Sequence, residues 1–315
     1  MEKSFSAVTR LETAKTKFGK EPLLLAELAA YSFSCGNIKL GRGRLSLELS
    51  SEFEEIILRI SAIIRRLYAN APEIRVIDKN QHKKHTCFVL EISPQAPEGQ
   101  LLFEIGLLEG VDENYSFGSL NPAVFETVEC LDAVLRGAFL GCGVLCDPHK
   151  EYRLEFVLAH EEFAVYLLNR MLAYGFQAKT MTRRDRHVIY IKQIENISDI
   201  LILIGARNVM LDIENIRVYK DVKNRINRSD NCIIGNMGKM ITAAQRQLTD
   251  ILIVQKAGCR LSSSLKEACD LRQNYPEASL AELAALSGGA VTKSALNKRF
   301  IKLHEMAASI TERKM

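Results

Sequence analysis

The sequence has no cysteine framework, no metal-ligand cluster and no apolar segment long enough to span a membrane. Its eight cysteines are scattered, with no CxxC pair and no Cys/His group at zinc spacing. This distribution excludes a disulfide scaffold and indicates the reduced thiols of a cytosolic protein. The longest apolar run, about residues 200–206, is far short of the roughly 20 residues that cross a bilayer. We therefore expect a cytoplasmic protein with no membrane segment and, because a polar stretch follows Met1, no secretory leader.

Charge is distributed unevenly along the 315 residues. The net charge is only +4, but residues 221–315 carry 15 Lys and Arg against 9 Asp and Glu, a net of +6. The first 220 residues carry 27 against 29, a net of −2. A near-neutral body followed by a basic C-terminal third predicts that a polyanion binds to that third, with a merely solvated surface as the alternative.

A nine-residue segment occurs twice, 107 positions apart. The copies are LAAYSFSCG at residues 28–36 and LRGAFLGCG at residues 135–143, and both end in Cys-Gly. Each is followed by an extended run that contains Leu-Glu, with Glu48 and Glu155 again 107 positions apart. A repeat that keeps its register over this distance predicts a duplicated supersecondary unit.

The pattern predicts an α+β body of about 200 residues, with a surface of strands backed by helices and with repeats at about 20–110 and 125–210. A capping box of Ser51 and Glu54 should open a helix that runs to about Tyr68, and Gly41 and Gly43 should form a turn. Further helices are expected over residues 23–35, 132–142, 161–174 and 197–204, and strands within 38–49, 85–92, 153–158 and 188–192.

The last 50 residues predict three short helices in a helix-turn-helix arrangement. Ser and Glu three positions apart form capping boxes at the start of the first two helices, and a Ser-Gly-Gly turn follows the second. The expected features are the boxes Ser264/Glu267 and Ser279/Glu282, a stop at Tyr275-Pro276, the turn at residues 287–289 and a third helix from Thr292 to about Met306.

Residues 215–247, ahead of this region, are rich in Arg, Lys, Asn and Gly. They predict a connector helix, a turn around Gly235 to Gly238 and a second helix, and the alternative is a solvated interdomain linker. The predicted domains are therefore residues 1–218, which form the duplicated body, and residues 219–315, which form the connector and an all-α helix-turn-helix domain.

Helical spacing divides the third predicted helix into two faces. Leu296, Phe300 and Leu303 form the stripe that should be buried. The remaining face combines hydroxyl, amide and cationic side chains, which suit major-groove readout, although such a face can also be merely solvated. The candidates for base edges are Ser294, Asn297 and Lys298, and those for phosphates are Lys293, Arg299, Lys302, Arg225 and Arg228.

An RNA-binding or protein-binding scaffold is a further alternative for the basic region. Proteins that bind single strands stack bases on aromatic side chains. The only aromatic residues in this region are Tyr275 and Phe300, and Phe300 is predicted to be buried. Duplex DNA is therefore the favoured partner.

The repeated segment, with L-x-G-x-F-L-x-x-G in its second copy, resembles the LAGLIDADG motif of homing endonucleases. The resemblance implies two helices that cross closely on small residues and, in the nucleases, an acid before the last Gly of each copy that holds Mg²⁺. Cys35 and Cys142 stand there in this chain, and Phe33 and Leu140 fill the other acidic position. Thiols do not supply the hard oxygen ligands that Mg²⁺ requires. We therefore expect no catalytic residue, metal or cofactor, and a protein that is not an enzyme.

Two alternatives remain open for residues of this body. Cys35 and Cys142 could form a redox pair or a soft-metal site, whereas the favoured interpretation is that each is a small apolar residue at a tight helix crossing. A divergent metal-dependent endonuclease of the LAGLIDADG type could instead use Glu48 and Glu155, which recur in both repeats. Against this, both glutamates fit side chains that pair across a sheet or face solvent.

Three longer stretches extend the resemblance over essentially the whole chain. A degenerate LAGLIDADG body followed by a helix-turn-helix is similar to the WhiA family of sporulation and cell-division regulators. The family implies a sequence-specific transcription regulator, mostly of Gram-positive bacteria, that binds double-stranded DNA at the nucleoid and lacks nuclease activity. RNA polymerase, a sigma factor or another regulator are further candidate partners. The stretches are LRGAFLGCGVLCDPHKEYRLEF, LIGARNVMLDIENIRVYKDVKNRINRSDNC and VTKSALNKRFIKLHEMA.

Overall fold

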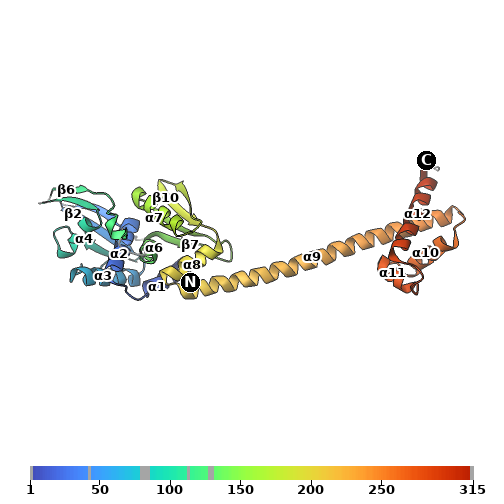
Figure 1. Cartoon of the computed structure of the whole chain (residues 1–315), viewed down its shortest axis with the longest axis horizontal. Helices are drawn as coiled ribbons and strands as arrows, with labels where there is room; N and C mark the ends of the chain where they lie inside the picture. Colours follow the sequence, from blue (N-terminus) through green and yellow to red (C-terminus); the bar gives the residue numbers. More distant parts are fainter. Residues whose placement is uncertain (1–2, 42–43, 79–85, 112–113, 127–130, 313–315) are drawn as a thin grey trace. The chain divides into compact units, whose positions relative to one another are not determined.

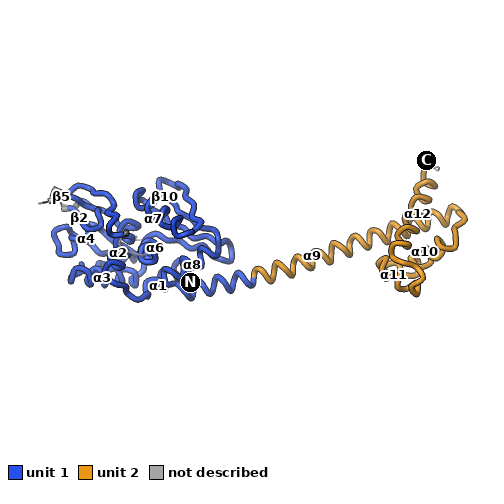
Figure 2. Tube along the Cα trace, in the orientation of Figure 1, with its two compact units in different colours: residues 1–219 blue, residues 220–315 orange. Residues whose placement is uncertain are grey.

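The computed structural model describes residues 3–41, 44–78, 86–111, 114–126 and 131–312. These fall into two compact units, Met1–Tyr219 and Lys220–Met315 (Figure 2). Unit 1 is α+β and unit 2 is helical, which confirms the predicted fold class (Figure 1). The predicted turn residue Gly43 and the predicted strand residue His85 lie outside the described residues. No helix in the described ranges is both long and apolar enough to cross a membrane.

Unit 1 contains the two predicted repeats. The first contains α2 (Glu21–Cys35), β1 (Asn37–Gly41), β2 (Arg44–Ser51), α3 (Glu54–Tyr68), β3 (Arg75–Asp78) and β4 (Thr86–Ile92). The second contains α6 (Leu131–Cys142), β7 (Gly143–Leu145), β8 (Leu154–Leu158), α7 (Glu161–Ala173), β9 (Lys179–Arg183), β10 (Arg186–Ile191) and α8 (Ile194–Ile204). Around them lie α1 (Phe5–Ala14), η1 (Pro97–Gly99), α4 (Gln100–Glu104), β5 (Leu108–Val111), β6 (Asn114–Phe117) and α5 (Ala123–Glu126).

The two four-stranded sheets have the same topology. Their strand orders are β1-β2-β4-β3 and β7-β8-β10-β9, and every pair is antiparallel. Each glutamate of the repeat occupies the same place in its sheet, Glu48 opposite Asn37 and Glu91, and Glu155 opposite Val144 and Tyr190. The duplication predicted from the 107-residue spacing is thus confirmed strand by strand.

The two repeats meet where α2 packs against α6, side by side in the middle of unit 1 (Figure 1). A Cβ added to Gly137 would lie 2.1 Å from the carbonyl oxygen of Glu27, and one added to Gly141 would lie 2.7 Å from the Cβ of Ser34. Real side chains never approach so closely, so these positions require glycine at this backbone separation. The close helix crossing predicted from the small residues is confirmed.

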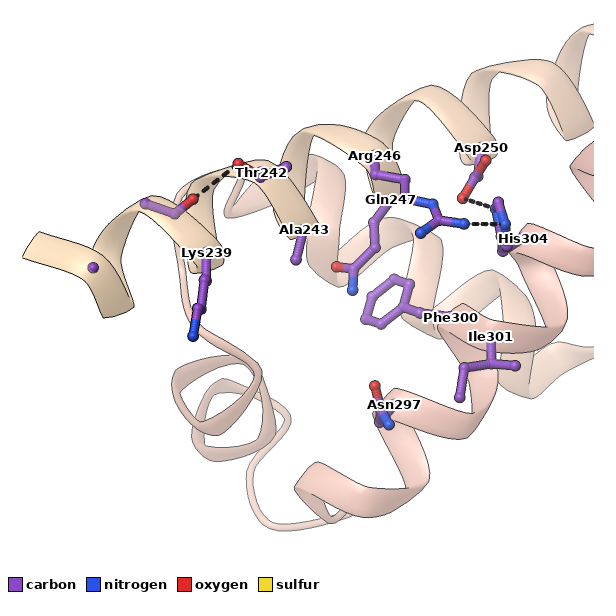
Figure 3. A pocket seen from close by; sticks show the side chains of 12 residues that line it. Lys239, Thr242, Ala243, Arg246, Gln247, Asp250, Asn297, Phe300, Ile301 and His304 are labelled. Atoms are coloured by element: carbon purple, nitrogen blue, oxygen red, sulfur yellow. Dashed lines mark hydrogen bonds and ion pairs between the residues drawn. The ribbon is translucent and has the colours of Figure 1, made fainter. Parts of the chain in front are cut away.

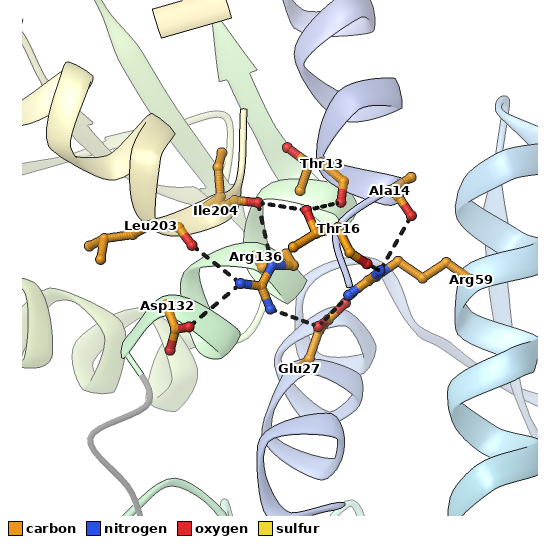
Figure 4. A network of polar contacts seen from close by, with 9 residues as sticks. All are labelled: Thr13, Ala14, Thr16, Glu27, Arg59, Asp132, Arg136, Leu203 and Ile204. Atoms are coloured by element: carbon orange, nitrogen blue, oxygen red, sulfur yellow. Dashed lines mark hydrogen bonds and ion pairs between the residues drawn. The ribbon is translucent and has the colours of Figure 1, made fainter. Parts of the chain in front are cut away.

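A buried ion-pair network ties this crossing to the elements around it (Figure 4). The carboxylate of Glu27, 1% exposed, accepts from Arg59 Nε at 2.6 Å and Nη2 at 3.0 Å, and from Arg136 Nη1 at 3.2 Å. Arg136 also donates to the carbonyl oxygens of Leu203 and Ile204, at 3.2 and 3.3 Å, where α8 ends. One carboxylate therefore connects α2, α3, α6 and the C-terminus of α8.

Unit 2 contains α9 (Arg207–Lys256) from Lys220 onwards, α10 (Ser263–Asn274), α11 (Leu280–Leu286) and α12 (Lys293–Glu312). The predicted turn around Gly235 to Gly238 is wrong, because α9 is one continuous helix through both residues. A helix-interior glycine costs only about 1 kcal/mol relative to alanine, and without a proline the helix is not broken. Unit 2 has its own core, built on Ile251, Leu265, Cys269, Leu283, Leu296, Phe300 and Leu303.

Two predicted capping boxes are also wrong. Ser51 ends β2, and the N-cap of α3 is Phe53, which makes no side-chain cap. Ser264 lies inside α10, whose N-cap is Ser262. In the first case the serine oxygen accepts from the Phe53 N–H two residues on, at 3.1 Å, and forms a local turn instead of a cap.

Replacing Glu27 by glutamine tests the buried network. The change Glu27→Gln keeps the shape of the side chain but leaves buried Arg59 without a counter-ion and Arg136 with only the partly exposed Asp132. We expect the free energy of unfolding of unit 1 to fall by about 3–5 kcal/mol, measured by urea denaturation followed by circular dichroism. The control is Asp132→Asn, which removes a partly exposed partner 3.5 Å from Arg136 and should cost less than about 1 kcal/mol. Equal, small losses in both variants would contradict this role for Glu27.

Candidate nucleic-acid interface

The helix-turn-helix is built by local capping contacts. The Ser279 hydroxyl accepts from the Glu282 N–H at 3.2 Å, and the Glu282 carboxylate accepts from the Ser279 N–H at 2.6 Å, so this predicted capping box is confirmed. Gly288 and Gly289 follow α11 with φ of +66° and +79°, a conformation that side chains disfavour. The Thr292 hydroxyl then accepts from the Ala295 N–H at 3.3 Å, as predicted, although α12 continues to Glu312, past the expected end near Met306.

The α12 helix has the two predicted faces. Leu296, Phe300 and Leu303 are 0%, 4% and 1% exposed, which confirms the buried stripe. Because this stripe fixes the rotation of the helix, the opposite face points to solvent. The exposed candidates are Lys293, Ser294, Asn297, Lys298 and Lys302 on α12, and Arg225 and Arg228 on α9.

Arg299 differs from the other candidates. Its guanidinium pairs with the Glu267 carboxylate at 2.7 Å, and its side chain is only 21% exposed. Glu267, which was predicted to cap α10, therefore ties that helix to α12. A phosphate would have to compete with this carboxylate, so we assign Arg299 to holding α12 against α10.

Arg272 is a structural residue that the sequence did not reveal. It is 2% exposed and donates to the carbonyl oxygens of Tyr275, Pro276 and Ala278 and to the side chain of Gln247. Burial lowers the pKa of its guanidinium, and no carboxylate is among these acceptors. Arg272 therefore holds the backbone of the turn between α10 and α11. The sequence did not indicate this role, because an arginine within a helical pattern is normally exposed.

A groove of about 610 Å³ lies between α9 and α12 in unit 2 (Figure 3). Asn297, a candidate for base contact, lines it. His304, also on α12, faces α9: its Nδ1 is 2.9 Å from the Asp250 carboxylate, and Arg246 contacts its other ring nitrogen. The other lining residues of the groove are Gly235, Gly238, Lys239, Thr242, Ala243, Gln247, Phe300 and Ile301.

In unit 1, Cys35 and Cys142 lie where the two repeats meet. Desolvation by burial raises the pKa of Cys35 to about 12 and that of Cys142 to about 11, so both are neutral thiols at physiological pH. Beside them, Arg10 donates to the Gly143 carbonyl at 2.7 Å and, with one carboxylate, Glu52, lines a cavity of about 300 Å³. Neutral thiols beside a guanidinium do not fit Mg²⁺, which is bound by several oxygen ligands.

The described residues also give no support to the two alternatives, a soft-metal site and a nuclease centre at Glu48 and Glu155. The described residues contain no group of three or more His, Cys, Asp or Glu placed to hold a metal ion. Glu48 pairs with Lys39 on the neighbouring strand. Glu155 accepts from Arg153 Nε at 2.6 Å and from Arg183 at 3.2 Å. Both glutamates therefore pair within their own sheets.

Family models match almost all of the chain outside its ends. A WhiA N-terminal LAGLIDADG-like domain matches residues 23–108, a WhiA LAGLIDADG-like domain matches residues 131–223, and a WhiA C-terminal HTH domain matches residues 226–307. The two LAGLIDADG-like matches correspond to the two repeats, and the third covers the groove and α12 as far as residue 307.

Named relatives cover nearly the full length. A probable cell division protein WhiA of Clostridium botulinum (strain Eklund 17B / Type B) is 34% identical over 289 residues, which cover 91% of this chain and 92% of the relative. That of Alkaliphilus metalliredigens (strain QYMF) is 32% identical over 308 residues, 96% and 97% of the two chains. The crystal structure of full-length DUF199/WhiA from Thermatoga maritima shares 21% identity and a TM-score of 0.56 over 98% of this chain and 99% of its own, which shows a common fold.

The raised thiol pKa values predict a pH dependence of stability. An unfolded thiol ionises near pH 9, whereas Cys35 and Cys142 do so near pH 12 and pH 11 in the folded chain. Their contribution is complete below about pH 9 and is lost as the pH rises towards these folded values. The free energy of unfolding of unit 1, from urea denaturation, should therefore fall less steeply above pH 9 in the double variant Cys35→Ala/Cys142→Ala than in the unmodified chain. Parallel curves would show that the thiols are not held neutral.

Proposed function

The chain belongs to the WhiA family, and on this premise we propose that it is a sequence-specific DNA-binding transcription regulator. The observation that carries the proposal is the exposed face of α12, where amide, hydroxyl and ammonium groups project from a capped helix-turn-helix. The relatives are named as cell division proteins. We assign the chain to cell division, chromosome segregation or sporulation in a Gram-positive bacterium, acting in the cytoplasm at the nucleoid.

In the proposed complex α12 lies in the major groove. Ser294, Asn297 and Lys298 contact base edges, since amide and ammonium side chains there distinguish adenine and guanine from the other bases. Lys293 and Lys302 contact phosphates, and Arg225 and Arg228 add phosphate contacts from α9. Arg299 holds α12 against α10 through Glu267 and so fixes the angle at which these side chains reach the DNA.

We further propose that unit 1 has no nuclease activity and serves as a contact surface for RNA polymerase, a sigma factor or another regulator. The chemistry of the former metal position supports this, because two neutral thiols and a guanidinium stand in place of the two acids of the homing endonuclease motif. No observation favours the alternative, a divergent endonuclease, over this proposal.

DNA binding can be tested by fluorescence anisotropy with the full chain and a duplex that the protein selects from a random pool. With four to six phosphates neutralised, log affinity should fall with log salt at a slope of roughly −4 to −5. Lys298→Ala should weaken binding by about 1–3 kcal/mol and relax the sequence preference. The control Lys266→Ala removes an exposed lysine of α10 and should change little. A slope near zero would contradict the proposal.

Cleavage is tested with supercoiled plasmid and Mg²⁺. We expect the full chain to leave the plasmid supercoiled, because neither thiol is ionised and the adjoining Arg10 repels a cation. The products are separated on an agarose gel. A nicked or linear product that a chelator abolishes, and that a second preparation reproduces, would show that unit 1 is still a nuclease.

A further inference from the structure

Two glycines in the interior of α9 face open space. A Cβ added to Gly235 or Gly238 would meet nothing within 4 Å, although both residues are part of the continuous helix. A glycine destabilises a helix relative to alanine. Here no described residue packs into the space that a side chain at either position would fill. Glycine is used in this way where a ligand approaches the backbone closely.

Both glycines line the groove between α9 and α12. Lys239 and Arg246 are exposed and lie on the same face of α9, at positions that follow the helical repeat from Gly235. The opposite wall is α12, where Asn297 projects into the same space. The groove thus combines a bare stretch of helix, two cations and a residue proposed to contact a base.

Arg246 is held in place by a relay of hydrogen bonds that runs from Arg246 through His304 to Asp250. A guanidinium only donates, so Nε2 of His304 must accept from Arg246, and the ring proton is on Nδ1. Nδ1 then donates to the Asp250 carboxylate at 2.9 Å, and Asp250 is 8% exposed. The relay fixes one N–H group of Arg246, leaves its other donors for a ligand, and occupies the carboxylate that lines the groove.

We propose that this groove binds the phosphate backbone of the DNA strand next to the base pairs that α12 reads. Lys239 and Arg246 contact the phosphates, Gly235 and Gly238 let the strand approach α9, and His304 and Asp250 are positioning residues for Arg246. The proposal rests on the proposed function, and its chemistry is that of phosphate recognition by ammonium and guanidinium groups. Asn297 favours DNA over an acidic protein segment, because it joins the groove to the base-reading face.

The test uses the full chain and the selected duplex. Gly238→Glu adds a carboxylate to the groove, at a position where a Cβ meets nothing within 4 Å, and should lower affinity at least tenfold. Gly238→Ala stabilises the helix but puts a methyl group where the strand approaches, so it should lower affinity by a smaller factor. The control Lys266→Ala, outside the groove, should bind normally. Arg246→Ala should lessen the salt slope by about 0.9 and weaken binding equally for all sequences. Thermal unfolding followed by circular dichroism verifies that each variant is folded.

The role of His304 in positioning Arg246 can be measured separately. If His304 acts only through Arg246, then His304→Ala should lower DNA affinity, and the double variant Arg246→Ala/His304→Ala should lose no more than Arg246→Ala alone. Additive losses would show that His304 contributes separately and would overturn the relay.

The outcomes separate this proposal from the proposed function. If Lys298→Ala weakens binding but Gly238→Glu and Arg246→Ala change neither affinity nor salt slope, the groove does not bind DNA and the role of α12 stands. If these two groove variants leave DNA binding intact but abolish binding of a fluorescent polyglutamate peptide, the groove takes an acidic protein segment and the proposal is wrong. If the unmodified chain binds no duplex, both proposals fail.

Discussion

The close crossing of α2 and α6 is the constraint on which unit 1 depends. It requires glycine at positions 137 and 141, and it places the carboxylate of Glu27 where it neutralises Arg59 and Arg136 together. Such a charge cluster is tolerated in a core only when every charge is paired and hydrogen-bonded. Since Arg136 also donates to the last carbonyl oxygens of α8, one buried carboxylate fixes the crossing and the helix that leads into α9. The two sheets, identical in topology, belong one to each of the repeats that meet at that crossing.

The residues that hold this fold differ from those on which nuclease chemistry would depend. The crossing needs small side chains along the helices and a carboxylate at Glu27, whereas a metal centre would need acids at the helix ends. Cys35 and Cys142 at those ends cost the fold little, because burial suits a neutral thiol and penalises a carboxylate. A LAGLIDADG body can therefore keep its architecture with the chemistry removed.

Features with a sequence period or a fixed spacing were predictable, and features that depend on tertiary contacts were not. The 107-residue repeat led to the duplicated topology, and Ser279/Glu282 with the Gly-Gly turn led to the helix-turn-helix. The strands β3 and β9 were missed because they are exposed edge strands without apolar alternation. The Ser-x-x-Glu pattern predicted capping boxes wrongly at Ser51 and Ser264. Whether the serine hydroxyl accepts from an N–H of the first helical turn depends on the backbone geometry, which the pattern does not contain. Buried arginines carry no signal in one sequence, since the same residue type is usually exposed.

Two arginines of unit 2 show why formal charge overstates the capacity for phosphate contacts. Arg272 is enclosed by backbone carbonyl groups, and Arg299 is paired with Glu267. Arg246 is different, because its partner is a ring nitrogen of His304 and not a carboxylate. The excess of 15 Lys and Arg over 9 Asp and Glu in residues 221–315 is thus divided between cations that build the helix-turn-helix and cations that remain for a ligand. The number of counter-ions released by DNA should follow the second group alone, which is a property of the fold and not of the composition.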